Sequence, residues 1–181
     1  SRPDANFRGF SGTICSGQLQ CGDEVVVLPA RSKARIKSIE TMDGELNRAE
    51  AHDAITVTLD RELNLARGDM LVPGDAEPRI TTEFQATIVW MSEQPLVIEK
   101  RYWLKHTTRK TPCEIKTLHH RTDVNSLARL SAPVLRLNEI GFCTLQTTEP
   151  VVCDDYQTNR TTGSFILVDR ITHETVAAGL I

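Results

Sequence analysis

A basic stretch between residues 100 and 121 is the part of the sequence best suited to bind charged molecules. It holds seven basic side chains against one acid, Glu114, and it also contains three histidines. Such a concentration of positive charge attracts phosphates and acidic protein surfaces. A solvated face without a partner has the same composition, since exposed ion pairs contribute only about 0–1 kcal/mol each. We expect the contacts to a partner to come from Arg101, Lys105, Arg109, Lys110 and Arg121.

Signatures of catalysis are missing from the sequence. It contains no G-x-x-x-x-G-K-[ST] phosphate loop, no G-x-G-x-x-G after a strand, no G-x-S-x-G and no H-E-x-x-H. His119 and His120 are weak metal ligands, because adjacent residues of a strand point to opposite faces and no nearby Cys or carboxylate completes a ligand set. We therefore predict no catalytic, cofactor-binding or metal-binding residue, and we do not expect this chain alone to be an enzyme.

The cysteines and the longest apolar runs indicate the compartment. Five cysteines without C-x-x-C spacing favour reduced thiols in a cytoplasmic protein, and we expect Cys143 and Cys153 to be small core residues. No apolar run approaches the roughly 20 residues that span a bilayer, so we expect no membrane contact. The chain begins without an initiator Met, and we expect it to be a fragment of a longer protein.

The two tryptophans differ in their surroundings. Trp90 lies in an alternating apolar segment, and we expect it in the core. Trp103 and Tyr102 lie within the basic stretch, where aromatic rings between cations can stack on nucleic-acid bases. We favour the alternative, in which both rings fill the interior and the charges face outward.

Period-two alternation is the dominant pattern, and it indicates half-buried strands that position these residues. It is clear over residues 34–37, 55–59 and 84–90, and residues 165–168 and 175–181 are strand-like as well. Turn signals such as Gly22-Asp23 and Asp43-Gly44 separate the runs at short intervals, which is typical of sandwiches and barrels. Residues 46–54 and 124–130 could each form a short helical turn.

A domain boundary is expected near residues 73–82, where Pro73, Gly74 and Pro78 cluster. Proline lacks the N–H that a sheet ladder requires, so this stretch has the composition of a linker. Two domains result, residues 1–80 and residues 81–181. The net charge of −3 falls in the first of them.

Several segments resemble domains 2 and 3 of elongation factor Tu and other translational GTPases. The segment from Gly12 to Gly17 resembles the family's strand pattern G-x-[VT]-x-x-G, and residues 22–25 resemble the G-[DE]-x-[VL] that follows. Residues 34–40 and 54–71 resemble the remaining strands and the closing R-G-[DQ]-x-[LI], and residues 84–181 are similar to the third domain. The resemblance implies an all-β fold of two consecutive antiparallel β-barrels.

Longer segments narrow the resemblance to the GTPase subunit of bacterial sulfate adenylyltransferase. They are RPDANFRGFSGTI, RYWLKHTTRKTPCEI, LNEIG and NRTTGSFILVDRITHETVAAG. The family's first domain, which binds and hydrolyses GTP, has no counterpart in the sequence. We therefore expect GTP and Mg²⁺ to bind the parent protein and no cofactor to bind this fragment.

The resemblance also implies partners and a function. In this family, adenosine 5′-phosphosulfate and pyrophosphate are made from ATP and sulfate on a smaller adenylyltransferase subunit, and GTP hydrolysis drives the uphill reaction of sulfate assimilation and cysteine biosynthesis. The expected partners are the chain's own GTPase domain and that smaller subunit in a heterodimer. The barrels would then couple the nucleotide state to adenylyl transfer.

Two other functions stay open at this point. The barrels could bind tRNA, as the related barrels of elongation factors do, although a net charge of −3 and a pI near 6.0 disfavour a nucleic-acid module. Alternatively, they could be a structural pair with no partner beyond their own GTPase domain.

Overall fold

The computed structural model describes residues 8–76 and 78–181, and every regular element in this part of the chain is a β-strand. The all-β class predicted from side-chain alternation is therefore confirmed. Residues 2–7, which contribute to the resemblance near the start of the chain, lie outside the described residues. No helix among the described residues has the length and apolar composition needed to cross a membrane.

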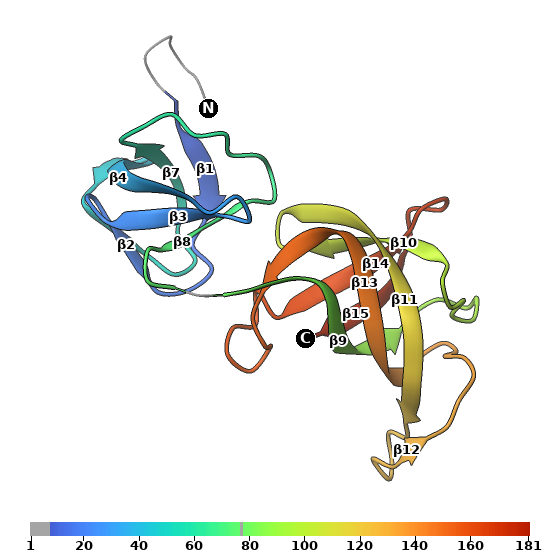
Figure 1. The fold of residues 1–181 in the computed structure, drawn as a ribbon. Coiled ribbons are helices and arrows are strands. Elements are labelled where there is room, and N and C mark those ends of the chain that lie inside the picture. The colour runs from blue at the N-terminus through green and yellow to red at the C-terminus, as the bar shows by residue number, and fades with distance from the viewer. Residues whose placement is uncertain (1–7, 77) are drawn as a thin grey trace. The chain divides into compact units, whose positions relative to one another are not determined.

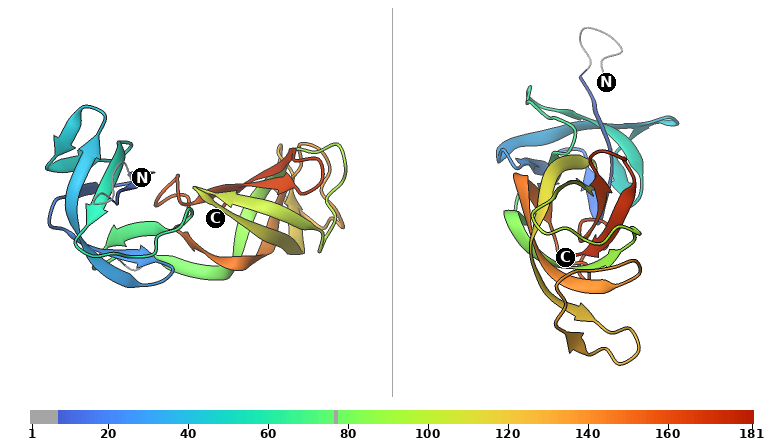
Figure 2. Two further views of the ribbon diagram at one scale, coloured as in Figure 1. Left: turned by 90° about the horizontal axis from the view of Figure 1, so that it is seen from above. Right: turned by 90° about the vertical axis from the view of Figure 1, so that its right-hand side faces the viewer.

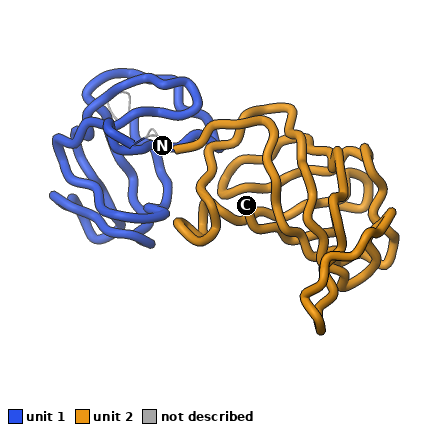
Figure 3. Tube along the Cα trace, turned by 60° about the horizontal axis from the view of Figure 1, so that its bottom comes forward, with its two compact units in different colours: residues 1–77 blue, residues 78–181 orange. Residues whose placement is uncertain are grey.

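The chain divides into two compact units, residues 1–77 and 78–181 (Figure 3). Only residues 74–78 separate the last strand of the first unit from the first strand of the second. The linker expected over residues 73–82 is therefore shorter than predicted. Its last four residues begin a long strand, in which Arg79, Ile80 and Thr81 pair with residues 151–153.

The first unit contains one curved sheet and a separate two-stranded ribbon. Its strands are β1 (Phe10–Thr13), β2 (Gln18–Gln20), β3 (Glu24–Leu28), β4 (Ser32–Thr41), β5 (Gly44–Leu46), β6 (Arg48–Glu50), β7 (Ala54–Leu59) and β8 (Met70–Pro73). The sheet runs in the order β1-β7-β4-β3-β8, with β5 paired to β4, and β2 pairs with β6. The long strand β4 pairs with β3 through its first residues and with β7 and β5 through its last ones, so it joins the two halves of the sheet.

Alternation along these strands builds the core of the first unit. Val25, Ala34, Ile36, Ile39 and Val57 are all buried, whereas their neighbours along the strands are at least partly exposed. Each large apolar side chain buried in this way contributes roughly 1.5–3 kcal/mol.

The second unit is a closed barrel (Figures 1 and 2). Its strands are β9 (Arg79–Trp90), β10 (Arg101–His106), β11 (Arg109–Thr122), β12 (Arg129–Leu130), β13 (Ile140–Cys153), β14 (Ser164–Asp169) and β15 (Thr175–Leu180). Six strands follow the order β10-β14-β15-β9-β13-β11, and a further pairing of β10 with β11 closes the ring, while β12 pairs with β11 outside it. Closure leaves the ring without unpaired edges, which makes it a stiff body.

The core of the barrel confirms the positions predicted from alternation. Trp90 is 1% exposed, its indole N–H donates to the Gln94 carbonyl at 2.8 Å, and its ring meets Tyr102 edge to face at 5.9 Å. Cys143 and Cys153 are buried core residues, as expected. Burial raises the pKa of Cys143 to about 12, so this thiol is unreactive at neutral pH.

The helical turn expected at residues 46–54 is wrong, whereas the one expected at residues 124–130 is present in part, since the Leu127 N–H donates to the Asp123 carbonyl at 2.8 Å. The first segment contains β6 and the flanking ends of β5 and β7, and residues 129–130 form β12. The residues that form strands instead do so because neighbouring strands supply backbone partners that a local pattern does not reveal: β6 pairs with β2, and β12 pairs with β11.

Candidate functional site

The hairpin of β10 and β11 contains most of the basic stretch. A turn at Thr107 and Thr108 joins the strands, and Thr107 adopts a left-handed backbone conformation with a φ of 50°. Alternation along β10 buries Tyr102, Leu104 and His106 and directs Arg101, Trp103 and Lys105 outward. The outward residues of β10 therefore form a face with their direct partners on β11.

Three of the five residues predicted to contact a partner lie together on this face. Arg101, Lys105 and Lys110 are exposed, and Lys105 lies directly opposite Lys110 across the two strands. Like charges in direct cross-strand positions repel each other. The hairpin thus brings cations together at the cost of some stability.

The other two predicted residues are engaged elsewhere. The side chain of Arg109 is only 12% exposed and donates to Glu149 at 3.0 Å. Arg121 lies twelve residues beyond Arg109 near the other end of β11, and it pairs with Glu139. The structure therefore separates Arg109 and Arg121 from the three exposed cations.

Trp103 is not in the interior, which corrects the interpretation favoured from the sequence. Tyr102 is buried as expected, but Trp103 is half-buried on the outer face. Lys110 Nζ lies 4.4 Å from the centre of the Trp103 ring, and the Arg170 guanidinium lies 4.8 Å from it. Both distances are within the range of cation–π attraction.

Arg170 is the residue that sequence reasoning missed. It follows β14, and β14 pairs with β10 through the register Tyr102 to Asp169 and Trp103 to Val168. Arg170 is therefore far from the basic stretch in sequence but next to it in the sheet. The sequence shows only that Arg170 follows a predicted apolar strand. It does not show which strand pairs with that one.

The acids around this face are already engaged by other cations. Asp169 accepts a hydrogen bond from Lys100 Nζ at 2.7 Å, which is the main reason why the pKa of Asp169 falls to about 2. Lys116 lies 2.7 Å from Glu114 and lowers the pKa of that carboxyl. Among the described residues, none of the cations Arg101, Lys105, Lys110 and Arg170 forms an ion pair. We call these four cations and Trp103 the basic face.

A shallow depression adjoins the basic face. Its volume is about 190 Å³, and it is lined by Arg101, Pro112, Cys113, Glu114, Gln146, Thr147 and Thr148. Small-molecule sites typically measure about 300–1,000 Å³, so this depression is too small for a nucleotide.

The adjacent histidines of β11 share a face, contrary to expectation. A register shift between Leu118 and His120 inserts an extra residue, and the rings of His119 and His120 each lie 5.5 Å from the ring of Phe142. Such a bulge cancels the strict alternation on which the expectation depended. Among the described residues, no group of three His, Cys, Asp or Glu side chains is arranged to hold a metal ion.

His106, the third histidine of the stretch, belongs to the barrel interior. It is 1% exposed, and its Nε2 lies 2.7 Å from the Thr162 carbonyl oxygen. Burial lowers the pKa of His106, which favours the neutral ring with Nε2–H as the donor. It therefore adds no positive charge to the basic face at neutral pH.

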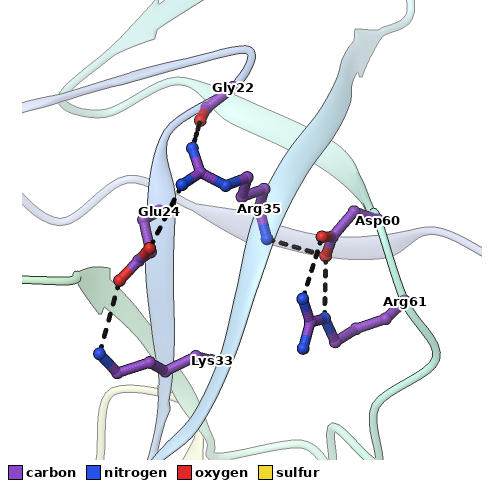
Figure 4. Close-up of polar contacts among 6 residues, drawn as sticks. All are labelled: Gly22, Glu24, Lys33, Arg35, Asp60 and Arg61. Carbon is purple, nitrogen blue, oxygen red and sulfur yellow. Dashed lines mark hydrogen bonds and ion pairs between the residues drawn. The ribbon is translucent and has the colours of Figure 1, made fainter.

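The first unit has a charged network of a different kind (Figure 4). Glu24 lies 3.5 Å from both Lys33 Nζ and Arg35 Nη2, and the Arg35 guanidinium also donates to the Gly22 carbonyl at 3.3 Å. Asp60 accepts the backbone N–H of Arg35 at 2.9 Å and two bonds from Arg61 at 3.3 Å. The Arg35 bond is the main reason why the pKa of Asp60 is lowered.

Comparison with known proteins identifies the fold and the family. Solved structures of Sup35 superpose on 94% of the chain, with TM-scores of 0.85 for the GDP complex and 0.84 for the GMPPNP complex. They share 19% sequence identity with this chain, which covers 42% of them. At this identity the likeness shows the fold alone.

The family follows from a closer match. Residues 83–181 match the family model described as GTP-eEF1A C-terminal domain-like, and the chain belongs to this family. The bifunctional enzyme CysN/CysC of Rhodopirellula baltica is 49% identical over the whole chain. Sulfate adenylyltransferase subunit 1 is 47% identical in Shewanella woodyi and 45% identical in Alteromonas mediterranea. The chain spans 28 to 39% of the length of these relatives. The resemblance to sulfate adenylyltransferase drawn from the sequence is confirmed.

Proposed function

We propose that this chain is the barrel pair of a GTPase subunit of sulfate adenylyltransferase, and that it couples nucleotide state to adenylyl transfer. The observation that carries the proposal is the 45 to 49% identity, over all 181 residues, to sulfate adenylyltransferase subunit 1 and to the bifunctional enzyme CysN/CysC. A translation factor is less well supported, since the Sup35 structures share only 19% identity with the chain.

In this proposal, the whole protein binds GTP and Mg²⁺ in a GTPase domain outside the present sequence. Its smaller partner subunit joins ATP and sulfate into adenosine 5′-phosphosulfate, an uphill reaction that GTP hydrolysis drives. A γ-phosphate orders switch segments of GTPase domains, and elements that pack against those segments change position when it is lost. The barrels would transmit that change to the partner subunit.

The architecture suits this mechanical role. The second unit is a closed ring in which every barrel strand has two neighbours, so it can move as one body without internal rearrangement. Its interior is filled by side chains such as Trp90, Leu104 and Ile115, which are at most 1% exposed. A well-packed interior resists deformation and passes on displacement.

The experiment is a distance measurement in the full-length protein assembled with its partner subunit. One label is attached at the exposed position 127 through Leu127→Cys, and the other in the GTPase domain. The partly exposed Cys15 and Cys21 are first replaced by Ser, whereas the buried thiols Cys113 and Cys143, whose pKa values burial raises to about 12, do not compete for the label. We expect different distances with GTP and with GDP; identical distances would contradict the proposal.

A further inference from the structure

We infer that the basic face is a docking surface for an acidic protein surface. Within the proposed function, on which this identification rests, that surface belongs to the smaller subunit of sulfate adenylyltransferase. The inference replaces the five residues expected from the sequence by Arg101, Lys105, Lys110 and Arg170 arranged around Trp103.

In the part of the chain that the structure describes, the basic face carries positive charge that is not balanced by ion pairs. Lys105 and Lys110 are direct cross-strand partners, and neither forms an ion pair among the described residues. Of the acids on the paired strands, Asp169 is held by Lys100 and Glu114 by Lys116, while Glu114 also lies directly opposite Arg101. An arrangement that leaves like charges opposite each other is favourable when a bound anion neutralises them.

Lys110 and Arg170 are preorganised by their contacts with the Trp103 ring. Lys110 comes from β11 and lies diagonally toward the hairpin turn, whereas Arg170 follows β14 on the other side of β10 and lies toward the start of that strand. The two cations thus come from the strands on either side of β10 and lie 4.4 and 4.8 Å from the centre of the ring. Cations held by a ring lose less freedom on binding than mobile surface lysines do.

The surroundings of Trp103 and the charge of the chain favour a protein partner over nucleic acid. Stacking on bases requires an accessible aromatic face, whereas Trp103 is half-buried and has Lys110 and Arg170 at 4.4 and 4.8 Å from the centre of its ring. Nucleic-acid modules are typically basic overall, whereas this chain has a net charge of −3. Exposed arginine beside a half-buried tryptophan is also the composition typical of energetic centres in protein interfaces.

The test measures association of the full-length protein with its partner subunit. The charge-reversal variant is Lys105→Glu combined with Lys110→Glu. The matched control is Arg129→Glu combined with Arg136→Glu, which changes the net charge equally. Both control arginines are exposed and belong to the far end of the barrel, where β12 pairs with the last residues of β11. Association rates are recorded at about 0.05 M and about 0.15 M salt, since salt screens steering.

We expect the charge reversal to slow association about tenfold at the lower salt concentration and to weaken its salt dependence, with the control within about twofold of wild type. Arg170→Ala should shorten the lifetime of the complex. Equal rates for wild type and the charge-reversal variant would overturn the docking surface but leave the proposed function intact. Failure of the wild-type protein to associate at all would overturn both.

A titration with tRNA distinguishes the remaining partner class. Tight binding of tRNA by the wild-type protein that the charge reversal abolishes would assign the basic face to nucleic acid and overturn the inference. Weak binding of tRNA that is equal in the wild-type protein and in the charge-reversal variant supports a protein partner.

Discussion

The outer faces of the two units handle charge in opposite ways. In the first unit, Glu24 lies between Lys33 and Arg35 and neutralises both, within the network drawn in Figure 4. In the second unit, Lys105 and Lys110 occupy equivalent cross-strand positions without a carboxylate between them. Both faces consist of alternating charged residues on paired antiparallel strands.

The difference shows that composition alone does not distinguish a face with balanced charges from a face with unbalanced charges. What separates them is whether the acids lie in cross-strand register with the cations. Neutralised pairs contribute a little stability, while unbalanced cations cost some and gain attraction for a partner. Trp103 makes the second arrangement tolerable by attracting two of the cations.

The largest expected loss of stability comes from removing the carboxylate that pairs with Lys100. Asp169→Asn removes the ion pair with Lys100 and turns a buried acceptor into a partial donor, so we expect a loss of about 2 kcal/mol. The measurement is urea unfolding followed by tryptophan fluorescence. Since both tryptophans lie in the second unit, the signal reports on that unit alone.

Asp169 also makes the stability of the second unit depend on pH in the acidic range. Asp169 has a pKa of about 2 in the folded chain and about 3.9 when unfolded. The folded value is depressed, so the stabilisation is fully present above about pH 4 and is lost as the pH falls toward about 2. Wild type should lose stability over that interval more steeply than Asp169→Asn. Parallel curves for the two proteins would mean that the ion pair contributes nothing.

A smaller loss of stability is expected near the end of β11 that lies away from the hairpin turn. Arg121→Met removes the partner of Glu139, which keeps its bond from the Arg136 backbone N–H at 2.8 Å, and we expect a loss of about 1 kcal/mol. Association with the partner subunit should stay unchanged in the same variant. Slower association would restore Arg121 to the partner-binding set predicted from the sequence.

Placing an acid in the basic face should imitate the first unit. Lys105→Glu puts a carboxylate directly opposite Lys110, and we expect the second unit to gain about 0.5 kcal/mol. The fluorescence midpoint in urea measures the gain, with Lys105→Gln as the uncharged control. A variant that is no more stable than the control would show that repulsion between the two lysines is negligible.

The smallest effect is expected where the charges are already balanced. Glu24→Gln leaves Lys33 and Arg35 without a carboxylate partner, and exposed pairs of this kind contribute at most about 0.5 kcal/mol. Far-ultraviolet circular dichroism follows the first unit, while the tryptophan transition of the second unit should not move. A loss above about 1 kcal/mol would make the network in Figure 4 a main support of its sheet.

Sequence patterns were sufficient for the fold class and for much of the core. Alternation placed Phe84, Ala86, Ile88 and Trp90 inside, and all four are buried. Alternation is a local property of a strand, since successive side chains must point to opposite faces. It fails where a bulge interrupts the ladder, as it does at His119 and His120.

The candidate site was predictable only in part. The charge of the basic stretch and the exposure of Arg101, Lys105 and Lys110 follow from the order of residues along one hairpin. Other features depend on which strands become neighbours when the barrel closes. They are the contact of Arg170 with Trp103, the outward position of Trp103, and the ion pairs that engage Arg109 and Arg121 elsewhere. Sequence determines the period of each strand, because that period is a property of the local backbone. Only the tertiary structure decides which side chains from distant strands share a face, because strand pairing brings together residues that no local pattern connects.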